Sequence, residues 1–396
     1  MRAAFFHDSW FVPGAGDKVF APMQMGYGNW LRYLSVFDSL LIVGRLGAEA
    51  RFGGAGALNE SSGPRVSFLL LPNYVTPHSF LFGRSALRKA VNEAVSGVDA
   101  VIARLPSELG LMACRVARSQ SIPAAVEVVG CPWDGFVHHG SVTGRVYAPL
   151  AAARLRREVG RAQHAIYVTE HFLQRRYPCS GVTANASNVD VELPARAIIR
   201  CRLSRTCDAG RKFVLGTIGS FLTKQKGIHV ALRALAEVED RLPGLEYRIL
   251  GPGDPEPYLR LAARLQLRTK LTFCRPVQSG QPVLDWLDDV DLYLQPSLQE
   301  GLPRALIEAM SRGCPAIGST TGGIPELLDG SALHAAGDYR SLARLVVKML
   351  QDKPALQAAC ERNYSIAATY ARPILDERRT AFWEEFGKHI QRLAAR

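Results

Sequence analysis

Strand-like and helix-like segments alternate regularly through the second half of the chain, and this alternation constrains the fold more than any other feature. Between residues 213 and 352, short apolar runs such as LEYRILGPG and DLYLQPS are each followed by an amphipathic stretch such as PEPYLRLAARLQ. Repeated strand–helix units of this length predict a parallel sheet covered by helices on both faces. We therefore expect a Rossmann-like domain here.

The first half is less regular but contains segments of the same kinds. Strands are expected in AAFFHD, SLLIVGR, RVSFLLLP, DAVIARLP, PAAVEVVG and HAIYVTE. Because 396 residues exceed what one hydrophobic core usually supports, we predict an α/β protein with two doubly wound domains. The irregular, charged stretch 185–210 is typical of a connection between domains. The expected domains are residues 1–203 and 204–375, with an aromatic-rich terminal helix, 376–396, packing back on the first.

Composition narrows the class of protein. No apolar run approaches the roughly 18 residues of a membrane span, and the N-terminus lacks a signal-peptide core, so a cytoplasmic location is expected. The eight cysteines are scattered without a CxxC pair and are interpreted as reduced packing residues. The net charge of +12 indicates an anionic partner. The sequence contains no nucleic-acid-binding motif, so nucleic acid is not the expected partner. The arginine-rich stretches 84–89 and 154–161 suit either a solvated face or peripheral contact with an anionic inner membrane.

The stretch QEGLPRALIEAM places two glutamates on either side of an expected helix start. Pro303 suits the first helical turn, whose free N–H groups and positive dipole end can hold a phosphate. Glu308 then lies about 7–8 Å along the helix, whereas Glu300 stays in the preceding loop. Carboxylates that flank a phosphate site suit a nucleotide sugar, because they accept hydrogen bonds from sugar hydroxyls. Alternatively, Glu308 is a solvated glutamate, since it lies off the apolar stripe of the helix.

Other strand ends add candidates to the same crevice. GSFLTKQKG places Lys224 and Lys226 just after a strand, where ammonium groups can reach a phosphate or simply face solvent. In STTGGIPELL, Gly322 and Gly323 permit either close ligand approach or a turn. The acidic pair in DVD, 289–291, lies at the amino end of a strand, away from this crevice, so no metal site is expected.

Taken together, GSFLTKQKG, LGPG, PSLQEGLPRALIEAMSRGCPAIGSTTGGIPELL and the two-domain pattern resemble the retaining GT-B glycosyltransferases of family 4. The resemblance covers about residues 213–350. It implies two Rossmann-like domains facing a cleft and a metal-independent hexosyltransferase without a cofactor. The implied donor is a nucleoside diphosphate sugar, and the acceptor is a saccharide or lipid-linked saccharide in bacterial surface polysaccharide assembly.

By that resemblance, Glu308 would hold the ribose hydroxyls and Glu300 would contact the donor sugar. Lys226 would neutralise the diphosphate. Many members have arginine directly after the first glycine of GSFLTKQKG, where this chain has Ser220, so either Lys224 or Lys226 could take the phosphate role. The remaining donor-site positions implied by the resemblance are Gly219, Ser220, Arg275, Val277, Gly301, Leu302, Pro303 and, in the first domain, Gly28.

The first domain of such enzymes usually supplies a histidine from a strand end. Here the corresponding position is Val129 or Gly130, so no residue is clearly assigned to the role of that histidine. Candidates to replace it as a catalytic residue are Asp134, His138, His139 and Arg104.

Two other functions share these features. A nucleotide-sugar epimerase has the same two-domain architecture, and products formed with and without an acceptor would separate it from a transferase. An inactive nucleotide-sugar-binding or scaffold protein would bind a donor without hydrolysing it.

Overall fold

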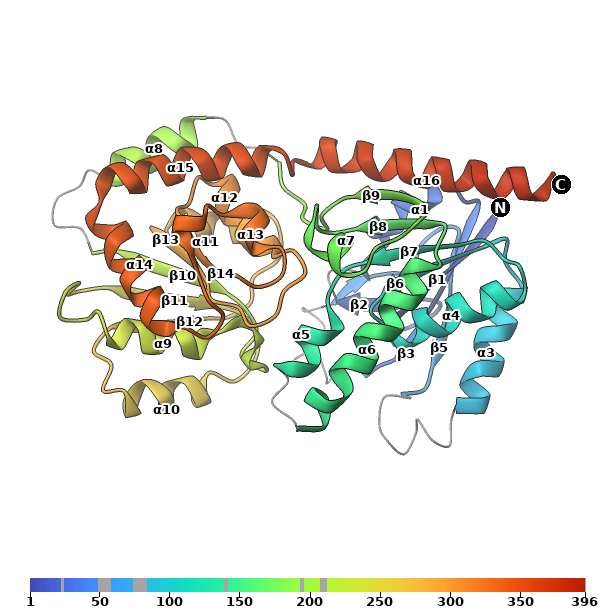
Figure 1. The fold of residues 1–396 in the computed structure, drawn as a ribbon, viewed down its shortest axis with the longest axis horizontal. Helices are drawn as coiled ribbons and strands as arrows, with labels where there is room; N and C mark the ends of the chain where they lie inside the picture. Colours follow the sequence, from blue (N-terminus) through green and yellow to red (C-terminus); the bar gives the residue numbers. More distant parts are fainter. Residues whose placement is uncertain are drawn as a thin grey trace.

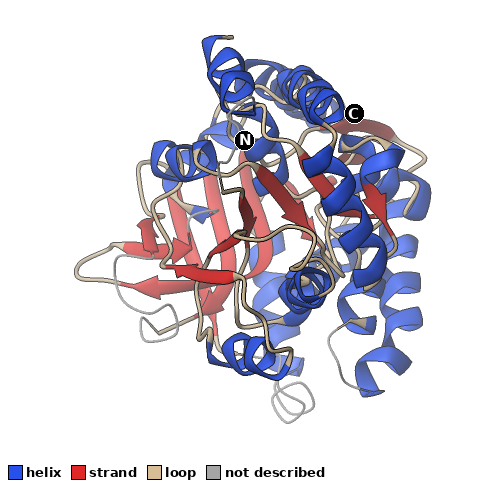
Figure 2. Ribbon diagram, turned by 90° about the vertical axis from the view of Figure 1, so that its left-hand side faces the viewer, coloured by secondary structure: helices blue, strands red, loops and turns tan. Residues whose placement is uncertain are grey.

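The computed structural model describes residues 1–22, 25–48, 58–73, 84–138, 142–192, 196–206 and 212–395. The chain forms two α/β domains, each built on a largely parallel sheet with helices packed against it (Figures 1 and 2). This architecture confirms the predicted α/β class with two doubly wound sheets.

In the first sheet, parallel strands lie in the order β5-β3-β1-β6-β7-β8-β9. The long first strand continues past this layer and pairs antiparallel with β2, which pairs antiparallel with β4. The sequence analysis did not anticipate this antiparallel extension. The strand bounds are β1 Arg2–Pro13, β2 Val19–Pro22, β3 Ser39–Leu46, β4 Leu58–Glu60, β5 Val66–Leu71, β6 Ala100–Leu105, β7 Ala124–Val128, β8 His164–Tyr167 and β9 Val182–Asn185.

Helices of the first domain bury apolar side chains against this sheet. In α4, for example, Ser107 caps the first turn by accepting a hydrogen bond from Gly110 N, and Leu109, Ala113 and Val116 are buried. The helices are α1 Leu31–Leu34, α3 Arg84–Ser96, α4 Glu108–Ser119, α5 Pro132–Val137, α6 Val142–Gly160 and α7 Phe172–Arg176.

The second sheet is parallel, in the order β12-β11-β10-β13-β14-β15. In chain order this is 3-2-1-4-5-6, the Rossmann arrangement, in which the direction of winding reverses between β10 and β13. The strands are β10 Val214–Ile218, β11 Glu246–Leu250, β12 Lys270–Cys274, β13 Leu292–Gln295, β14 Ala316–Ser319 and β15 Leu333–His334. The helices are α8 Ala197–Thr206, α9 Ile228–Ala236, α10 Glu256–Arg264, α11 Gln281–Asp288, α12 Arg304–Ser311, α13 Ile324–Leu327, α14 Tyr339–Gln351 and α15 Lys353–Ala368.

The C-terminal helix α16, Arg372–Ala394, leaves the second domain and lies along the first (Figure 1). Its Trp383 is fully buried, with its ring 5.0 Å from that of Tyr33 in α1, and Phe386 packs on Phe37. At the crossing, Arg372 N donates to Val191 O at 2.9 Å. The Arg372 guanidinium also forms ion pairs with the acidic residues on either side of Val191, so the two chain segments that join the domains lie side by side.

A buried histidine beneath α16 makes the stability of this packing depend on pH. His164 in β8 is 2% exposed, contacts the ring of His389, and has no hydrogen-bond partner among the described residues. Burial lowers the pKa of His164 from 6.5 to about 4. The charges of His389 and Arg392 also lower this pKa, whereas the carboxylate of Glu385 raises it. The unfolded chain binds a proton near pH 6.5 that the folded protein excludes, so stability falls as pH drops from 6.5 towards 4.

We expect this histidine to contribute about 3 kcal/mol to the loss of unfolding free energy over that interval. His164→Leu should flatten the dependence of the melting temperature on pH between 6.5 and 4. The exposed His171→Leu serves as the matched control. A His164→Leu curve parallel to that of the wild type would contradict this account.

Candidate active site

A cavity of about 560 Å³ lies between the two domains. Its walls come from the ends of β6, β7 and β8 in the first sheet and of β10 and β11 in the second, together with the loop after β13. The carboxyl ends of both parallel sheets therefore open into the same space. Ligands of open α/β sheets bind at this edge, beside the point where the winding reverses. We take this cavity as the candidate active site.

The loop after β10 brings one lysine into the cavity. The lysine Lys226 lies at the end of a short 3-10 helix, Lys224–Lys226, and its Nζ is 2.7 Å from Glu300 Oε1. A Cβ atom added at Gly219 would lie 2.6 Å from Lys226 Cγ, so glycine is needed where the lysine crosses the strand end. Gly227 has a φ of 69°, and a Cβ there would meet Pro296 O at 1.8 Å. Gly219 thus gives room to Lys226, and Gly227 lets the loop pack against the end of β13.

Glu300 is the most thoroughly fixed side chain of the site. It is 8% exposed, and its Oε1 accepts hydrogen bonds from Lys226 Nζ, Gln295 Nε2 and Ser297 Oγ at 2.7, 2.9 and 2.7 Å. No bond to Oε2 is found among the described residues. One carboxylate oxygen is therefore anchored, while the residue lines the cavity.

The amino end of α12 forms the adjoining wall. Pro303 is the N-cap and no side chain caps the helix, so the first-turn N–H groups keep their capacity to donate. The structure places this proline one position before the helix, rather than in its first turn as the sequence suggested; lacking an N–H, it cannot itself donate to a phosphate. Gly301 touches the other domain, since a Cβ added there would lie 2.3 Å from Val129 O. The helix tip therefore lies at the contact between the domains.

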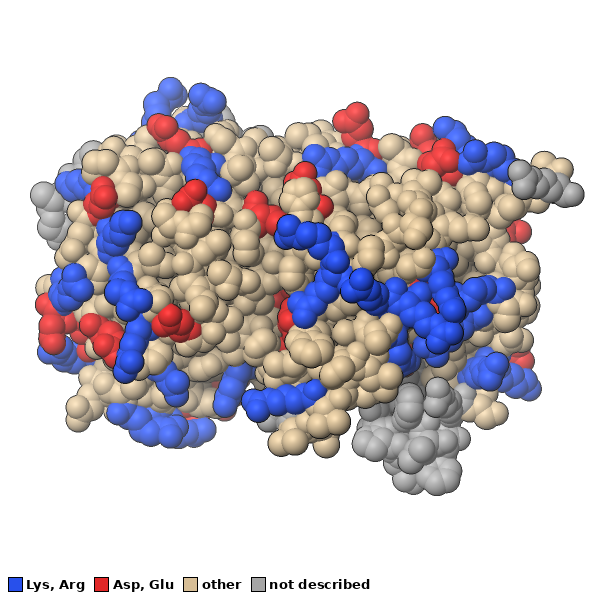
Figure 3. Space-filling view, in the orientation of Figure 1, with Lys and Arg blue, Asp and Glu red and all other residues tan. Residues whose placement is uncertain are grey.

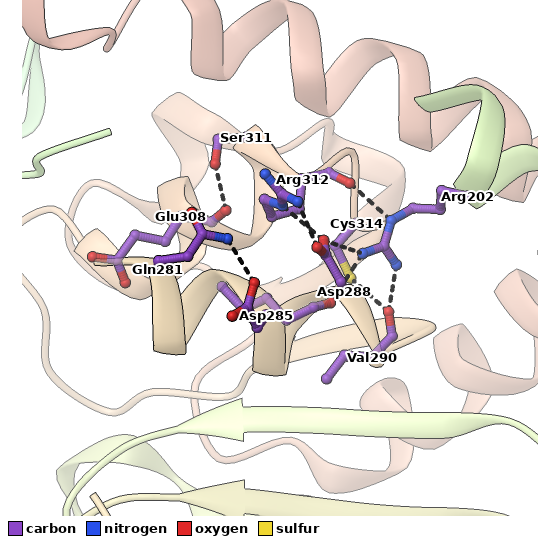
Figure 4. Close-up of polar contacts among 10 residues, drawn as sticks. Arg202, Gln281, Asp285, Asp288, Val290, Glu308, Ser311, Arg312 and Cys314 are labelled. Atoms are coloured by element: carbon purple, nitrogen blue, oxygen red, sulfur yellow. Dashed lines mark hydrogen bonds and ion pairs between the residues drawn. The ribbon is translucent and has the colours of Figure 1, made fainter. Parts of the chain in front are cut away.

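Glu308 lies one helical turn further and lines the same cavity. Burial raises the pKa of its carboxyl, while the guanidinium of Arg304 lowers it and Asp190 raises it. Figure 4 shows the side chain pointing away from the network in which Asp288 pairs with Arg312. No hydrogen bond to the carboxylate is found among the described residues, which leaves both oxygens available to a ligand.

The first-domain wall contains a buried ion pair. Arg104 of β6 lines the cavity at 7% exposure, and its Nη1 lies 3.2 Å from Glu127 Oε2 in β7. Glu127 Oε1 accepts a hydrogen bond from Tyr33 OH at 2.6 Å. Asn188, Val129 and Val168 complete this wall. Of the first-domain candidates from the sequence, the structure brings Arg104 to the cavity.

The other first-domain candidates lie elsewhere. Asp134 in α5 pairs with Arg176 at 3.3 Å, and His138 Nδ1 lies 3.0 Å from Asp134 O within the same helical turn. Neither lines the cavity, nor does Gly28. His139 lies outside the described residues.

In the second domain, the structure brings together most of the positions taken from the sequence. Lys224 and Arg275 are not among the cavity residues, although the neighbours of Arg275, Pro276 and Val277, are. Arg304, the first residue of α12, lines the cavity and was not singled out, although it directly follows the Gly-Leu-Pro turn. The predicted positions that line the cavity are Gly219, Ser220, Lys226, Val277, Glu300, Gly301, Leu302, Pro303 and Glu308.

A second contact joins the domains beside the cavity. The carboxylate of Glu326 in α13 accepts hydrogen bonds from the backbone N–H groups of Glu170, His171 and Phe172 at 2.7, 3.1 and 2.6 Å. These three residues lie at the amino end of α7 in the first domain. Gly323 also packs on Thr169, with a Cβ there 3.0 Å from Thr169 Cγ2.

Within the described ranges, no group of three or more His, Cys, Asp or Glu side chains could hold a metal ion. The same ranges contain no helix that is both long and apolar enough to cross a membrane.

Residues 212–352 match the protein family described as Glycosyl transferases group 1. The chain is 29% identical to protein CapJ of Staphylococcus aureus, over 89% of this chain and 87% of that protein. It is 34% identical to the amylovoran biosynthesis glycosyltransferase AmsK of Erwinia amylovora, over 33% of this chain and 34% of AmsK. The second match therefore spans about a third of each protein.

Among solved structures, HepE of Anabaena in complex with UDP superposes with a TM-score of 0.63 at 15% identity, covering 99% of this chain and 100% of that one. WaaG, a glycosyltransferase involved in lipopolysaccharide biosynthesis, superposes with a TM-score of 0.61 at 14% identity, covering 98% of this chain and 99% of that one. At these identities the likeness concerns the fold. The chain thus has the GT-B fold, and its second domain matches the glycosyl transferases group 1 family over residues 212–352.

Proposed function

We propose that this protein is a retaining glycosyltransferase of polysaccharide biosynthesis that uses a nucleoside diphosphate sugar. The observation that supports it best is the cavity at the facing sheet edges, which Lys226 and the uncapped end of α12 line together with Glu300 and Glu308. A lysine and a helix N-terminus suit a diphosphate, and the two acids suit the hydroxyl-bearing groups on either side. Two similar proteins have names that fit this proposal: AmsK is named for amylovoran biosynthesis, and WaaG for lipopolysaccharide biosynthesis.

In this proposal, Glu308 accepts hydrogen bonds from the ribose hydroxyls and Glu300 binds the sugar. The bond between the anomeric carbon and the diphosphate oxygen breaks, and a bond from the acceptor hydroxyl oxygen forms on the same face. The acceptor proton passes to the departing diphosphate. The charge of that diphosphate is stabilised by Lys226 and by the N–H groups of Gly301 and Leu302, as electrostatic catalysis requires. No metal or cofactor takes part in this scheme.

A thermal-shift series with UDP, GDP, ADP and their sugars tests the donor. A nucleotide that binds the folded protein raises its melting temperature increasingly with concentration, by mass action. We expect one base to stand out, and its sugar to be transferred with retention to a saccharide acceptor. Failure of every nucleotide to stabilise the protein would refute the proposal. Interconversion of the donor sugar without any acceptor would favour the epimerase instead.

We further propose that the acceptor is lipid-linked and that α6 contacts an anionic membrane. The side chains of Val142, Val146 and Leu150 are 76%, 75% and 56% exposed, and their four-residue spacing places them on one face of the helix. Lysine and arginine side chains gather over α4 and α6 on the face drawn in Figure 3. An apolar stripe beside arginines suits the headgroup region of an anionic bilayer.

Vesicle sedimentation checks this contact. The protein should bind phosphatidylglycerol vesicles, bind less at high salt, and bind phosphatidylcholine vesicles weakly. Val146→Asp should lower the affinity about tenfold, because burying a valine contributes about 1.5 kcal/mol or more. Val182→Asp, at an exposed valine of β9, is the matched control. Equal binding by both variants and the wild type would contradict the assignment.

A further inference from the structure

Two arginines from different domains line the same cavity. Arg104 lies near the end of β6 in the first domain, and Arg304 is the first residue of α12 in the second. The two walls touch close by, where Gly301 meets Val129 O. The cationic groups are therefore held at one cavity by elements that are far apart in the chain.

Arg104 is held rigidly but keeps donor capacity. Among the described residues its guanidinium bonds through Nη1 to Glu127, whose other oxygen is occupied by Tyr33 OH. Arginine has five N–H donors, so one ion pair uses only part of its capacity. The buried glutamate thus fixes the position of the guanidinium at the cavity wall without saturating it.

Arg304 has no ion pair with any described residue. Burial and the charge of Arg104 lower its pKa, while Glu308 and Glu300 raise it. Arginine nevertheless stays protonated in proteins. In the ligand-free protein the two guanidinium groups repel each other across the cavity, and an anion between them relieves that repulsion. Arg304 therefore adds to the cavity a charge that no described carboxylate pairs, whereas Lys226 and Arg104 are each paired with a glutamate.

We propose that Arg104 and Arg304 bind one phosphoryl group of the donor diphosphate from opposite domains. This inference rests on the proposed function and adds to it the identity of the cations at the phosphate. The donor is favoured over a phosphate on the acceptor because Arg304 begins the same helix whose amino end and Glu308 form the donor wall. Since each arginine belongs to a different domain, the phosphoryl group also stabilises the closed arrangement of the cleft.

The test uses the full chain and the nucleoside diphosphate that stabilises the wild type. Isothermal titration compares that diphosphate with its nucleoside for the wild type, Arg104→Gln, Arg304→Gln and the double variant. Each single change should weaken diphosphate binding about tenfold and leave nucleoside binding unchanged. The double variant should lose less than the product of the single losses, because both arginines contact the same group. Arg156→Gln, on the exposed face of α6, is the matched control.

Folding is separated from binding by a second pair of variants. Arg104→Gln leaves Glu127 buried without its counter-ion, so Arg104→Lys should restore part of the diphosphate affinity and of the melting temperature. Arg304→Gln breaks no ion pair among the described residues, so its melting temperature should match that of the wild type.

The outcomes distinguish the two proposals. If the wild type binds no nucleoside diphosphate, the proposed function itself fails before any variant is made. If the wild type binds one and both glutamine variants bind it with an affinity within twofold of the wild type, the proposal for Arg104 and Arg304 is wrong. The proposed function then stands. If diphosphate binding is unchanged but the KM of a phosphate-bearing acceptor rises, the phosphoryl group belongs to the acceptor, which overturns the assignment to the donor.

Discussion

Replacing Glu308 by glutamine should lower kcat/KM for the donor about 100-fold. In the proposed complex this carboxylate accepts hydrogen bonds from ribose, and a hydrogen bond to a charged group contributes about 1.5–3 kcal/mol. Losing about 3 kcal/mol of this interaction corresponds to that factor. Steady-state kinetics at varied donor concentration measure the change.

The same substitution should leave the melting temperature unchanged or raise it. Burial raises the pKa of the Glu308 carboxyl, so its ionised form is less favourable in the folded protein than in the unfolded chain. A glutamate kept at a cost to stability is the behaviour expected of a binding residue. Glu361→Gln, an exposed acid in α15, is the matched control. Donor kinetics equal to those of the wild type in a folded Glu308→Gln protein would exclude this residue from the donor site.

Gly301→Ala should also reduce kcat/KM about 100-fold, for a different reason. The added Cβ would lie 2.3 Å from Val129 O, a backbone atom of the other domain that cannot rotate away. The domains must therefore separate at the helix tip, and a displacement of about 1 Å at a reacting centre can cost about 100-fold in rate. Kinetics and thermal unfolding are measured together.

The separate apolar clusters around Ile249 in the second domain and Val101 in the first lie away from this contact, so unfolding should change little. Gly330→Ala provides the comparison, because a Cβ there meets nothing within 4 Å. An active Gly301→Ala protein would show that turnover does not need the contact between Gly301 and Val129.

The alternation of strands and helices was enough to predict the α/β class and the crevice of the second domain. Loops that follow parallel strands reach the same sheet edge, so Lys226, Glu300 and Glu308 line one cavity although they are far apart in the chain. Their roles towards a ligand stay predictions. The antiparallel pairing of β2 and β4 was not foreseen, because short strands carry little periodic signal.

The first-domain wall was harder to predict. Asp134 and His138 follow Val129 closely in sequence, but neither lines the cavity, and Asp134 pairs with Arg176 instead. Arg104 reaches the cavity because β6 lies beside β7, where Glu127 holds it, and that pairing depends on the order of strands. Arg304 was missed because helical periodicity alone does not reveal which neighbouring domain a first-turn residue faces.

The paired crossings at Val191 and Arg372 limit the relative freedom of the domains. Two bodies joined by one strand of chain can twist and slide in any direction. Joined at two adjacent points, they keep mainly one rotation, about the line through those points. Opening and closing would then follow a single arc, so the same pairs of side chains would meet each time the cleft shuts.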